Sequence, residues 1–182
     1  MSNNSTTESG WLTPLNSEAV YDDALVEQLQ QWVSGITGLP AASVIAAGPV
    51  KTSSAFTAEE NGCAIAVSTL SSTGAPVIQN QQEGNAELWR FELIECDITF
   101  YGPEGQRYAT RLRDGLTISQ NIDELDRFDI SAENCGDITS SFETTDNISR
   151  RINQLRVRLN RKTVRLYGIK SLVETPFNLI GE

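Results

Sequence analysis

The fold is decided by one stretch of the sequence, Glu87–Asn121, which reads ELWRFELIECDITFYGPEGQRYATRLRDGLTISQN. Its first half alternates as a strand does, with Leu88, Ile94, Ile98 and Phe100 on one face and Trp89, Phe91 and Leu93 on the other. Polar residues replace the second series beyond Leu93, so one face meets a core throughout and the other only near its start. We therefore expect a central or near-central strand.

A tight break and an amphipathic helix follow this strand. Pro103 fixes φ and lacks the N–H that a first helical turn leaves unused, and Glu104 places negative charge at the positive end of the helix dipole. The residues spaced for one helical face are Tyr108, Ala109, Leu112, Gly115 and Leu116. This spacing predicts a helix over residues 104–118 that packs on the strand before it.

The rest of the chain supplies further strands and helices. The patterns predict a helix over Asp22–Thr37, strands over Val44–Ala46 and Gly62–Leu70, a projecting hairpin over Ser71–Ala86, helical turns over Asn121–Phe128, and strands over Ile138–Glu143 and Ile148–Tyr167. Asp22 or Asp23 is expected to cap the first helix, and a change of phase near Arg161–Thr163 predicts a β-bulge or a turn. Leu172–Ile180 is expected to form an edge strand or an extended tail. This order indicates an α+β fold, an antiparallel sheet with helices packed on one face.

The composition is that of one globular domain. The 182 residues are 39% hydrophobic and 21% charged. Residues 1–10 are rich in Ser, Thr and Asn without apolar spacing, which predicts a disordered amino-terminal arm ahead of a single domain at residues 11–182. Trp11, beside this arm, is a candidate anchor for an interface. No apolar run is long enough to cross a bilayer and no signal peptide is recognisable, so we expect no membrane partner.

The residues that usually mark an active site are missing. The chain contains no His, and no nucleophile elbow, phosphate-binding loop or zinc-protease motif occurs in it. Cys63, Cys96 and Cys135 lack the spacing of a zinc set and predict reduced thiols in a cytosolic setting, with Cys96 in the core. The adjacent acids Asp22-Asp23 and Glu59-Glu60 fit solvated charge. We predict no catalytic, cofactor or metal site, and a protein that is not an enzyme.

The charge is divided unevenly along the chain. Residues 1–149 carry 6 basic and 22 acidic side chains, a balance of −16, and residues 150–182 carry 8 basic and 2 acidic ones, a balance of +6. The candidate interface residues are Arg150, Arg151, Arg156, Arg158, Arg161, Lys162 and Arg165. They fit either a solvated face that keeps a long strand from pairing with other chains, or a contact with the acidic surface of a second copy or with a phosphate backbone. The acidic remainder of the chain favours a second copy over DNA.

The central stretch also carries a recognisable signature. Phe100-Tyr101-Gly102-Pro103, Leu112-Arg113-Asp114-Gly115-Leu116 and Gln120-Asn121 resemble the "FYGP…A…LRDGL…QN" pattern of the neck or tail terminator family of contractile-tailed bacteriophages. Ile36–Pro40, Gly136–Ile138 and the late Arg-rich strand resemble companion features in the same order. The resemblance covers most of residues 11–172.

This resemblance implies a structural virion protein that caps the finished tail tube as a homohexameric ring and joins the tail to the head. The implied partners are further copies of the chain, tail tube and sheath proteins, and a head-side neck or connector protein, with DNA only passing through the ring. The implied location is the neck or tail of the virion, and the host cytoplasm during assembly. Two alternatives stay open: another head–tail connector or tail-completion protein of similar fold, and a nucleic-acid-binding module that uses the strand at 150–170.

Overall fold

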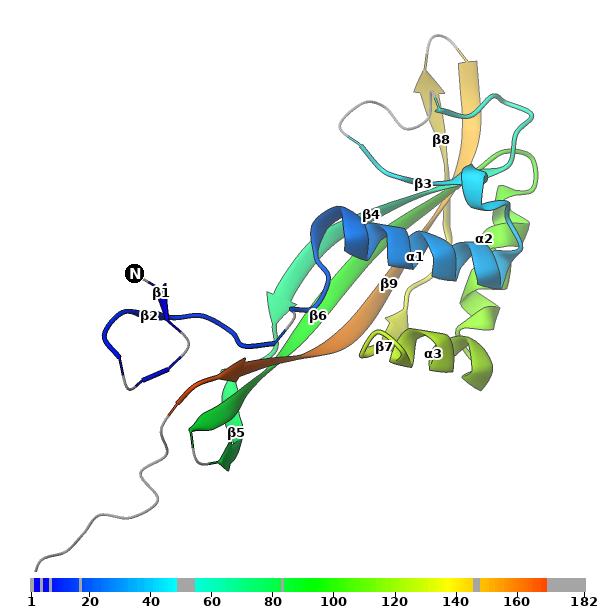
Figure 1. Ribbon diagram of the computed structural model, residues 1–182. Helices are drawn as coiled ribbons and strands as arrows, with labels where there is room; N and C mark the ends of the chain where they lie inside the picture. Colours follow the sequence, from blue (N-terminus) through cyan, green and yellow to red (C-terminus); the bar gives the residue numbers. More distant parts are fainter. Residues whose placement is uncertain are drawn as a thin grey trace, which may run out of the picture. The chain divides into compact units, whose positions relative to one another are not determined.

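The structure is a computed structural model and describes residues 2–3, 5–6, 8–16, 18–48, 55–82, 84–145 and 148–169. The chain divides into two compact units, whose elements are labelled in Figure 1. The terminal unit comprises Met1–Ala19, Gly74–Arg90 and Thr163–Glu182, and the central unit comprises Val20–Thr73 and Phe91–Lys162. The expected edge strand or tail at Leu172–Ile180 lies outside the described residues.

A sheet forms the framework of the central unit. Its strand order is β3-β4-β6-β9-β7, so β6 (Asn85–Tyr101), the strand with which the sequence argument began, lies in the middle as predicted. The other strands are β3 (Val44–Ala46), β4 (Gly62–Ser72), β7 (Ile130–Cys135), β8 (Thr139–Thr145) and β9 (Ile148–Tyr167). β4 pairs antiparallel with β6, and β7 and β8 pair antiparallel with β9, whereas the short β3 pairs parallel with β4. The sheet is therefore mixed, with one parallel strand at its edge.

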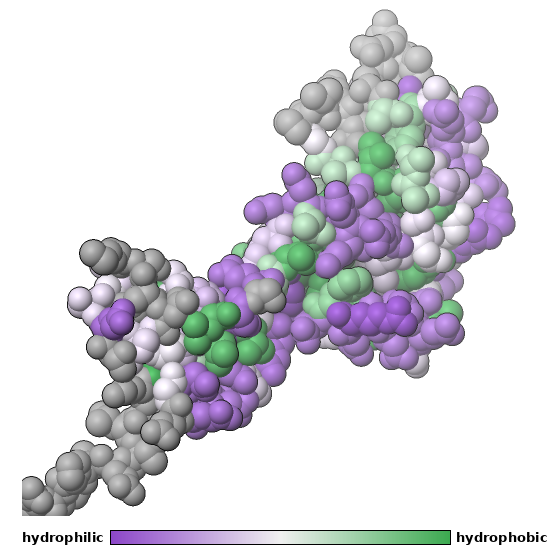
Figure 2. All heavy atoms as spheres, in the orientation of Figure 1, coloured by the Kyte–Doolittle hydropathy of each residue, from purple (hydrophilic) through white to green (hydrophobic). Residues whose placement is uncertain are grey.

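Three α-helices cover one face of this sheet. They are α1 (Asp22–Thr37), α2 (Gly105–Gly115) and α3 (Ser119–Asp126), and a short 3₁₀ helix, η1 (Ala41–Ser43), follows α1. The main core joins residues of all three α-helices to the strands: Leu25, Leu29, Trp32, Val33, Ala109, Leu112, Leu116, Leu125, Cys63, Ile65, Ile94, Cys96, Ile98, Phe100, Leu155, Val157 and Leu159. Figure 2 shows hydrophilic residues along the outward sides of α1 and α3, as expected for amphipathic helices with one buried face. The predicted α+β fold with helices on one face is confirmed.

A second, smaller cluster lies on the other face of the sheet. It contains Phe56, Ala64, Tyr101 and Ile152, and the rings of Phe56 and Tyr101 have centroids 5.4 Å apart. Successive strand residues point to opposite faces, so Tyr101 lies across the sheet from its core neighbour Phe100. None of the described helices contributes to this cluster, and beyond it β6 carries the polar residues Asp97 and Glu95 on the same face.

The terminal unit contains the predicted hairpin. β5 (Val77–Gln82) pairs antiparallel with the first part of β6, and Gly84, with φ +89°, lies in the turn between them. All six residues of β5 are exposed. In the same unit β1 (Ser2–Asn3) pairs parallel with β2 (Trp11–Leu12), and the backbone N–H of Leu15 donates to the carbonyl oxygen of Leu166 at 2.7 Å. A strand at the amino terminus was not predicted.

Two local predictions are wrong. No side chain caps α1, whose N-cap residue is Tyr21, so Asp22 and Asp23 do not serve as caps. The change of phase expected near Arg161–Thr163 also does not occur: β9 runs through these residues as one strand, and burial continues to alternate through Leu159, Arg161 and Thr163. The inward-facing positions of β9 are polar from Arg161 onward. In the sequence, this change from apolar to polar residues looks the same as a shift of register.

Candidate interaction surface

Two ion pairs join β6 to β9 on the sheet face opposite the helices. Nε of Arg156 donates to Oδ1 of Asp97, and Nε of Arg158 donates to Oε1 of Glu95, each at 2.7 Å. From Arg156 to Arg158 the residue numbers rise along β9, while those of their partners fall along β6 from Asp97 to Glu95. This is the order expected of two antiparallel strands. We call these four residues the charge ladder. The strand period of two places its arginines on the face opposite the buried residues of β9.

The charge ladder is accessible to solvent. The side chains of Arg156 and Asp97 are 58% and 39% exposed. Burial acts to raise the pKa of Asp97, but hydrogen bonds from Arg156 and Ser68 together with the charge of Arg156 outweigh it and hold that pKa below its usual range. Each exposed pair of this kind contributes at most about 1 kcal/mol to stability. The ladder therefore matters more for the surface charge than for the fold.

A third pair on the same two strands is buried. Nε and Nη2 of Arg161 both donate to Oε2 of Glu92, at 3.0 and 2.7 Å, and the Arg161 side chain is fully buried. Nη1 of Arg161 donates to the carbonyl oxygen of Val20 at 2.6 Å, and the Tyr21 hydroxyl donates to the other Glu92 oxygen at 3.0 Å. The Arg161 guanidinium also lies over the Tyr21 ring, 4.5 Å from its centroid. Arg161 is thus a structural residue of the central unit, with no surface to offer a partner.

The other predicted interface residues lie elsewhere. The Arg150 guanidinium donates to the carbonyl oxygen of Phe56, and the Arg151 guanidinium lies 5.5 Å from the ring centroid of Phe142. Lys162 donates its backbone N–H to the carbonyl oxygen of Asp129, and Arg165 of the terminal unit lies 3.9 Å from Glu18. Of the predicted interface residues, Arg156 and Arg158 are thus the two that pair with β6 in the charge ladder.

The carboxylate partners were missed by sequence reasoning. Glu95 and Asp97 were seen as the polar side of β6, and Arg156 and Arg158 as the polar side of β9, but the sequence did not show that these strands are neighbours. Each arginine of the ladder already donates to a carboxylate of the same chain, so the ladder has no net charge. A phosphate backbone would have to displace those carboxylates to bind there.

A second surface feature is a groove between α1 and α3, with a volume of about 440 Å³. Its lining includes Gln28, Trp32, Ile36 and Phe128. Trp32 is 7% exposed, as predicted for a core residue, and its Nε1 donates to the carbonyl oxygen of Asn121 at 3.3 Å. Phe128, by contrast, is 39% exposed. The sequence did not predict this groove, because it forms between helices that are far apart along the chain.

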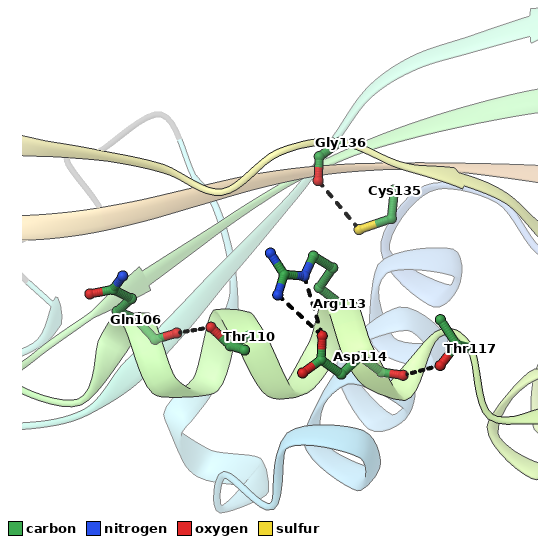
Figure 3. A network of polar contacts seen from close by, with 7 residues as sticks. All are labelled: Gln106, Thr110, Arg113, Asp114, Thr117, Cys135 and Gly136. Carbon is green, nitrogen blue, oxygen red and sulfur yellow. Dashed lines mark hydrogen bonds and ion pairs between the residues drawn. The ribbon is translucent and has the colours of Figure 1, made fainter.

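The carboxyl-terminal end of α2 is closed by local polar contacts (Figure 3). The Thr117 hydroxyl donates to the carbonyl oxygen of Asp114 at 2.7 Å, and Nε and Nη2 of Arg113 donate to Asp114 Oδ1 at 3.3 and 3.2 Å. Arg113 projects from the helix on the side of Cys135, whose thiol donates to the carbonyl oxygen of Gly136 at 3.7 Å. All of these contacts are exposed and join residues close in sequence, so each adds little to the stability of the fold.

The thiols are poor nucleophiles. Burial raises the pKa of Cys63, and burial together with the neighbouring Asp97 charge raises that of Cys96 to about 12. Burial also raises the pKa of Cys135, with Arg113 opposing the change. Within the described ranges, no group of three or more Cys, Asp or Glu side chains is arranged to hold a metal ion. No described helix is long and apolar enough to cross a bilayer.

Comparison with protein families identifies the chain. Residues 23–182 match the family model described as phage neck terminator protein. The chain belongs to this family. Comparison with curated proteins gives no match. As a phage neck terminator protein it is a structural component of the tail and neck, and its place is the virion. The family is structural rather than catalytic.

Proposed function

We propose that the chain caps the finished tail tube as a homohexameric ring and joins the tail to the head-side neck or connector protein. The observation that carries this proposal is membership of the phage neck terminator family over residues 23–182. The partners proposed are further copies of the chain, tail tube and sheath proteins, and the head-side neck protein, with DNA only passing through the ring. Assembly would take place in the host cytoplasm.

Two structural features support an assembling protein. The hairpin of β5 and β6 presents a strand that is exposed along its whole length, with Val77 and Ile78 43% and 46% exposed. Such a strand has a free edge and apolar side chains that another protein can cover. The charge ladder offers a polar sheet face on the other unit. This proposal also includes an amino-terminal arm at residues 1–10 ahead of one domain at residues 11–182. It includes a role for the basic residues as an interface.

Imaging of tails made without the protein tests the proposal. A terminator that caps the tube is expected to leave overlong tubes when it is missing, because nothing stops the addition of tube subunits. Tubes of normal length that fail to join heads would instead identify a connector, which is the alternative function. Particles that assemble normally without the chain would contradict both functions.

A further inference from the structure

An exposed tryptophan and the groove between α1 and α3 complement each other. Trp11, on β2 of the terminal unit, is 79% exposed, the largest exposed fraction among the large apolar side chains of the described residues. An indole buries about 150–250 Å² when it is enclosed, so leaving it in water forgoes a large hydrophobic stabilisation. A tryptophan this open in a single copy is a candidate anchor for a contact between molecules.

The groove has the properties of a receptor for such an anchor. Its volume of about 440 Å³ lies within the range of roughly 300–1,000 Å³ that is typical of binding sites. Ile36, Phe128 and the edge of Trp32 give it apolar walls, and the ion pair of Glu124 and Arg127, at 2.7 Å, lies at its side. Gly35 leaves the groove open, because a Cβ built there would meet nothing within 4 Å.

Gln28, one of the residues that line the groove, has a polar atom without a partner. Oε1 of Gln28 is buried and accepts no hydrogen bond from any described residue. A buried acceptor left unsatisfied costs about 1–3 kcal/mol, so a rotation of the half-buried Gln28 side chain that brings Oε1 to an arriving donor would be favoured. Of the large apolar side chains exposed in the described part of the chain, Trp11 alone has an N–H to donate; the others are Leu15, Val20, Leu70, Val77, Ile78, Phe91, Ile118, Phe128 and Phe142.

We propose that Trp11 of one copy inserts into the groove between α1 and α3 of a second copy, with its indole N–H donating to Gln28 Oε1. This inference rests on the proposed ring and names one contact within it. The tryptophan and the groove are different surfaces of the same chain, so the contact is head-to-tail and repeats around a ring until the ring closes. One indole covers much less than the roughly 800 Å² per partner of a stable interface, so Trp11 is an anchor within a larger contact.

Two substitutions remove the two halves of the contact. Trp11→Ala removes the anchor, and Gly35→Leu adds a side chain to the groove lining at a position where a Cβ meets nothing within 4 Å, and replaces a helical glycine by a better helix former. Each variant is expected to weaken self-association of the full chain, followed by light scattering behind a sizing column, by about 30-fold or more. Leu70→Ala is the matched control, since Leu70 is 44% exposed and lies outside the groove; it should associate like the wild type.

A mixture of the two variants tests the head-to-tail geometry. Trp11→Ala keeps an open groove and Gly35→Leu keeps its tryptophan, so one productive contact forms between them and neither partner can extend it. The expected product of an equimolar mixture is a dimer that grows no further. If both variants associate like the wild type, the Trp11 contact is wrong while the proposed ring stands.

A peptide titration decides the case in which the wild type stays monomeric in solution. A synthetic peptide of residues 8–16, which contains Trp11, is titrated by calorimetry into the full chain and into Gly35→Leu. Saturable binding to the wild type and none to Gly35→Leu supports the contact. No binding to the wild type up to about 1 mM overturns it. Failure of the proposed function is read separately, from tails made without the protein.

Discussion

Arg161 and Glu92 form a buried ion pair in which two guanidinium nitrogens, Nε and Nη2, share one carboxylate oxygen at 3.0 and 2.7 Å. The second carboxylate oxygen accepts the Tyr21 hydroxyl, so the pair links two strands to the residue that precedes α1. Burying two charges is costly unless each is paired and its other hydrogen-bonding groups are satisfied. Here both carboxylate oxygens of Glu92 accept hydrogen bonds, and Nε, Nη1 and Nη2 of Arg161 all donate. Along the chain, Glu92 is the second residue and Arg161 the second-last residue of Phe91–Lys162, one of the two segments of the central unit.

Glu92→Gln is expected to lower the free energy of unfolding by about 3–5 kcal/mol, because it leaves a fully buried guanidinium without its counter-charge. Urea denaturation, with the slope m compared between variants, measures the loss. The matched control is Glu95→Gln, which removes the partner of the half-exposed Arg158 and is expected to cost about 1 kcal/mol or less. Equal losses in the two variants would show that the burial of Arg161 does not set the cost.

The double variant Glu92→Leu/Arg161→Met provides a second measurement. It removes both charges and leaves apolar side chains in a buried site, so it is expected to be more stable than Glu92→Gln. A double variant as unstable as the single one would indicate that packing around Tyr21, and not the unpaired charge, is responsible.

Arg161 also shows where sequence reasoning stops. The helix α1 was predicted with its observed bounds because apolar residues recur at helical spacing along it, and β6 was recognised by its alternation. Both patterns depend on inward positions being apolar. Arg161 and Thr163 are inward and polar, so the pattern gave a bulge and assigned Arg161 to the surface. A buried arginine can be recognised only once its carboxylate is known to lie beside it.

The pairing within the charge ladder was missed for a similar reason. Arg156, Arg158, Glu95 and Asp97 are all visible in the sequence, but their pairing depends on β9 lying next to β6, which is a contact between segments about sixty residues apart. Local periodicity reports which face a residue occupies and does not report which strand is its neighbour. The uneven charge along the chain is therefore partly compensated within the fold.

Neutralising the acids of the ladder is expected to make DNA binding stronger than it is in the wild type. Glu95→Gln/Asp97→Asn frees two guanidinium groups on one exposed face, which can then contact phosphates. Fluorescence anisotropy with a labelled duplex measures the binding. Two phosphate contacts predict a loss of affinity of roughly tenfold between 50 and 200 mM salt.

The control adds Arg156→Ala/Arg158→Ala to the same variant, and binding should then vanish. The same measurement on the wild type decides between a structural neck protein and a nucleic-acid-binding module. Salt-sensitive binding by the wild type that is lost on Arg156→Ala/Arg158→Ala would favour the nucleic-acid-binding module over a ladder that is neutral in the native chain.

Acid should remove the contribution of Asp97. Its folded-state pKa is held below its ordinary value of 3.8, so the carboxylate stabilises the native state above that value. The contribution is lost as the pH falls through the folded-state pKa. Because the pair with Arg156 is exposed, the effect is expected to stay below about 1 kcal/mol. Denaturation of the wild type and of Asp97→Asn between pH 5 and pH 2 measures it, and the wild type should lose more stability than the variant.

Gly102, in the signature Phe100-Tyr101-Gly102-Pro103, is expected to be irreplaceable for the fold. Its φ is +92°, and a Cβ there would lie 2.3 Å from the carbonyl oxygen of Glu60 and 2.8 Å from the Cα of Asn61. Gly102→Ala therefore combines a left-handed backbone with a clash against main chain that cannot rotate away. We expect a loss of more than about 3 kcal/mol in the free energy of unfolding, measured by urea denaturation.

Gly38→Ala separates the cost of the left-handed backbone from the cost of the clash. Gly38, in the same unit, has φ +76° but would place its Cβ in open space, so its substitution should cost only about 1 kcal/mol. The close approach at Gly102 also brings Asn61 to α2, where its Oδ1 accepts the backbone N–H of Glu104 at 2.9 Å. The signature thus holds the loop before β4 against the start of α2. A Gly102→Ala variant as stable as Gly38→Ala would mean that this approach is not what the glycine provides.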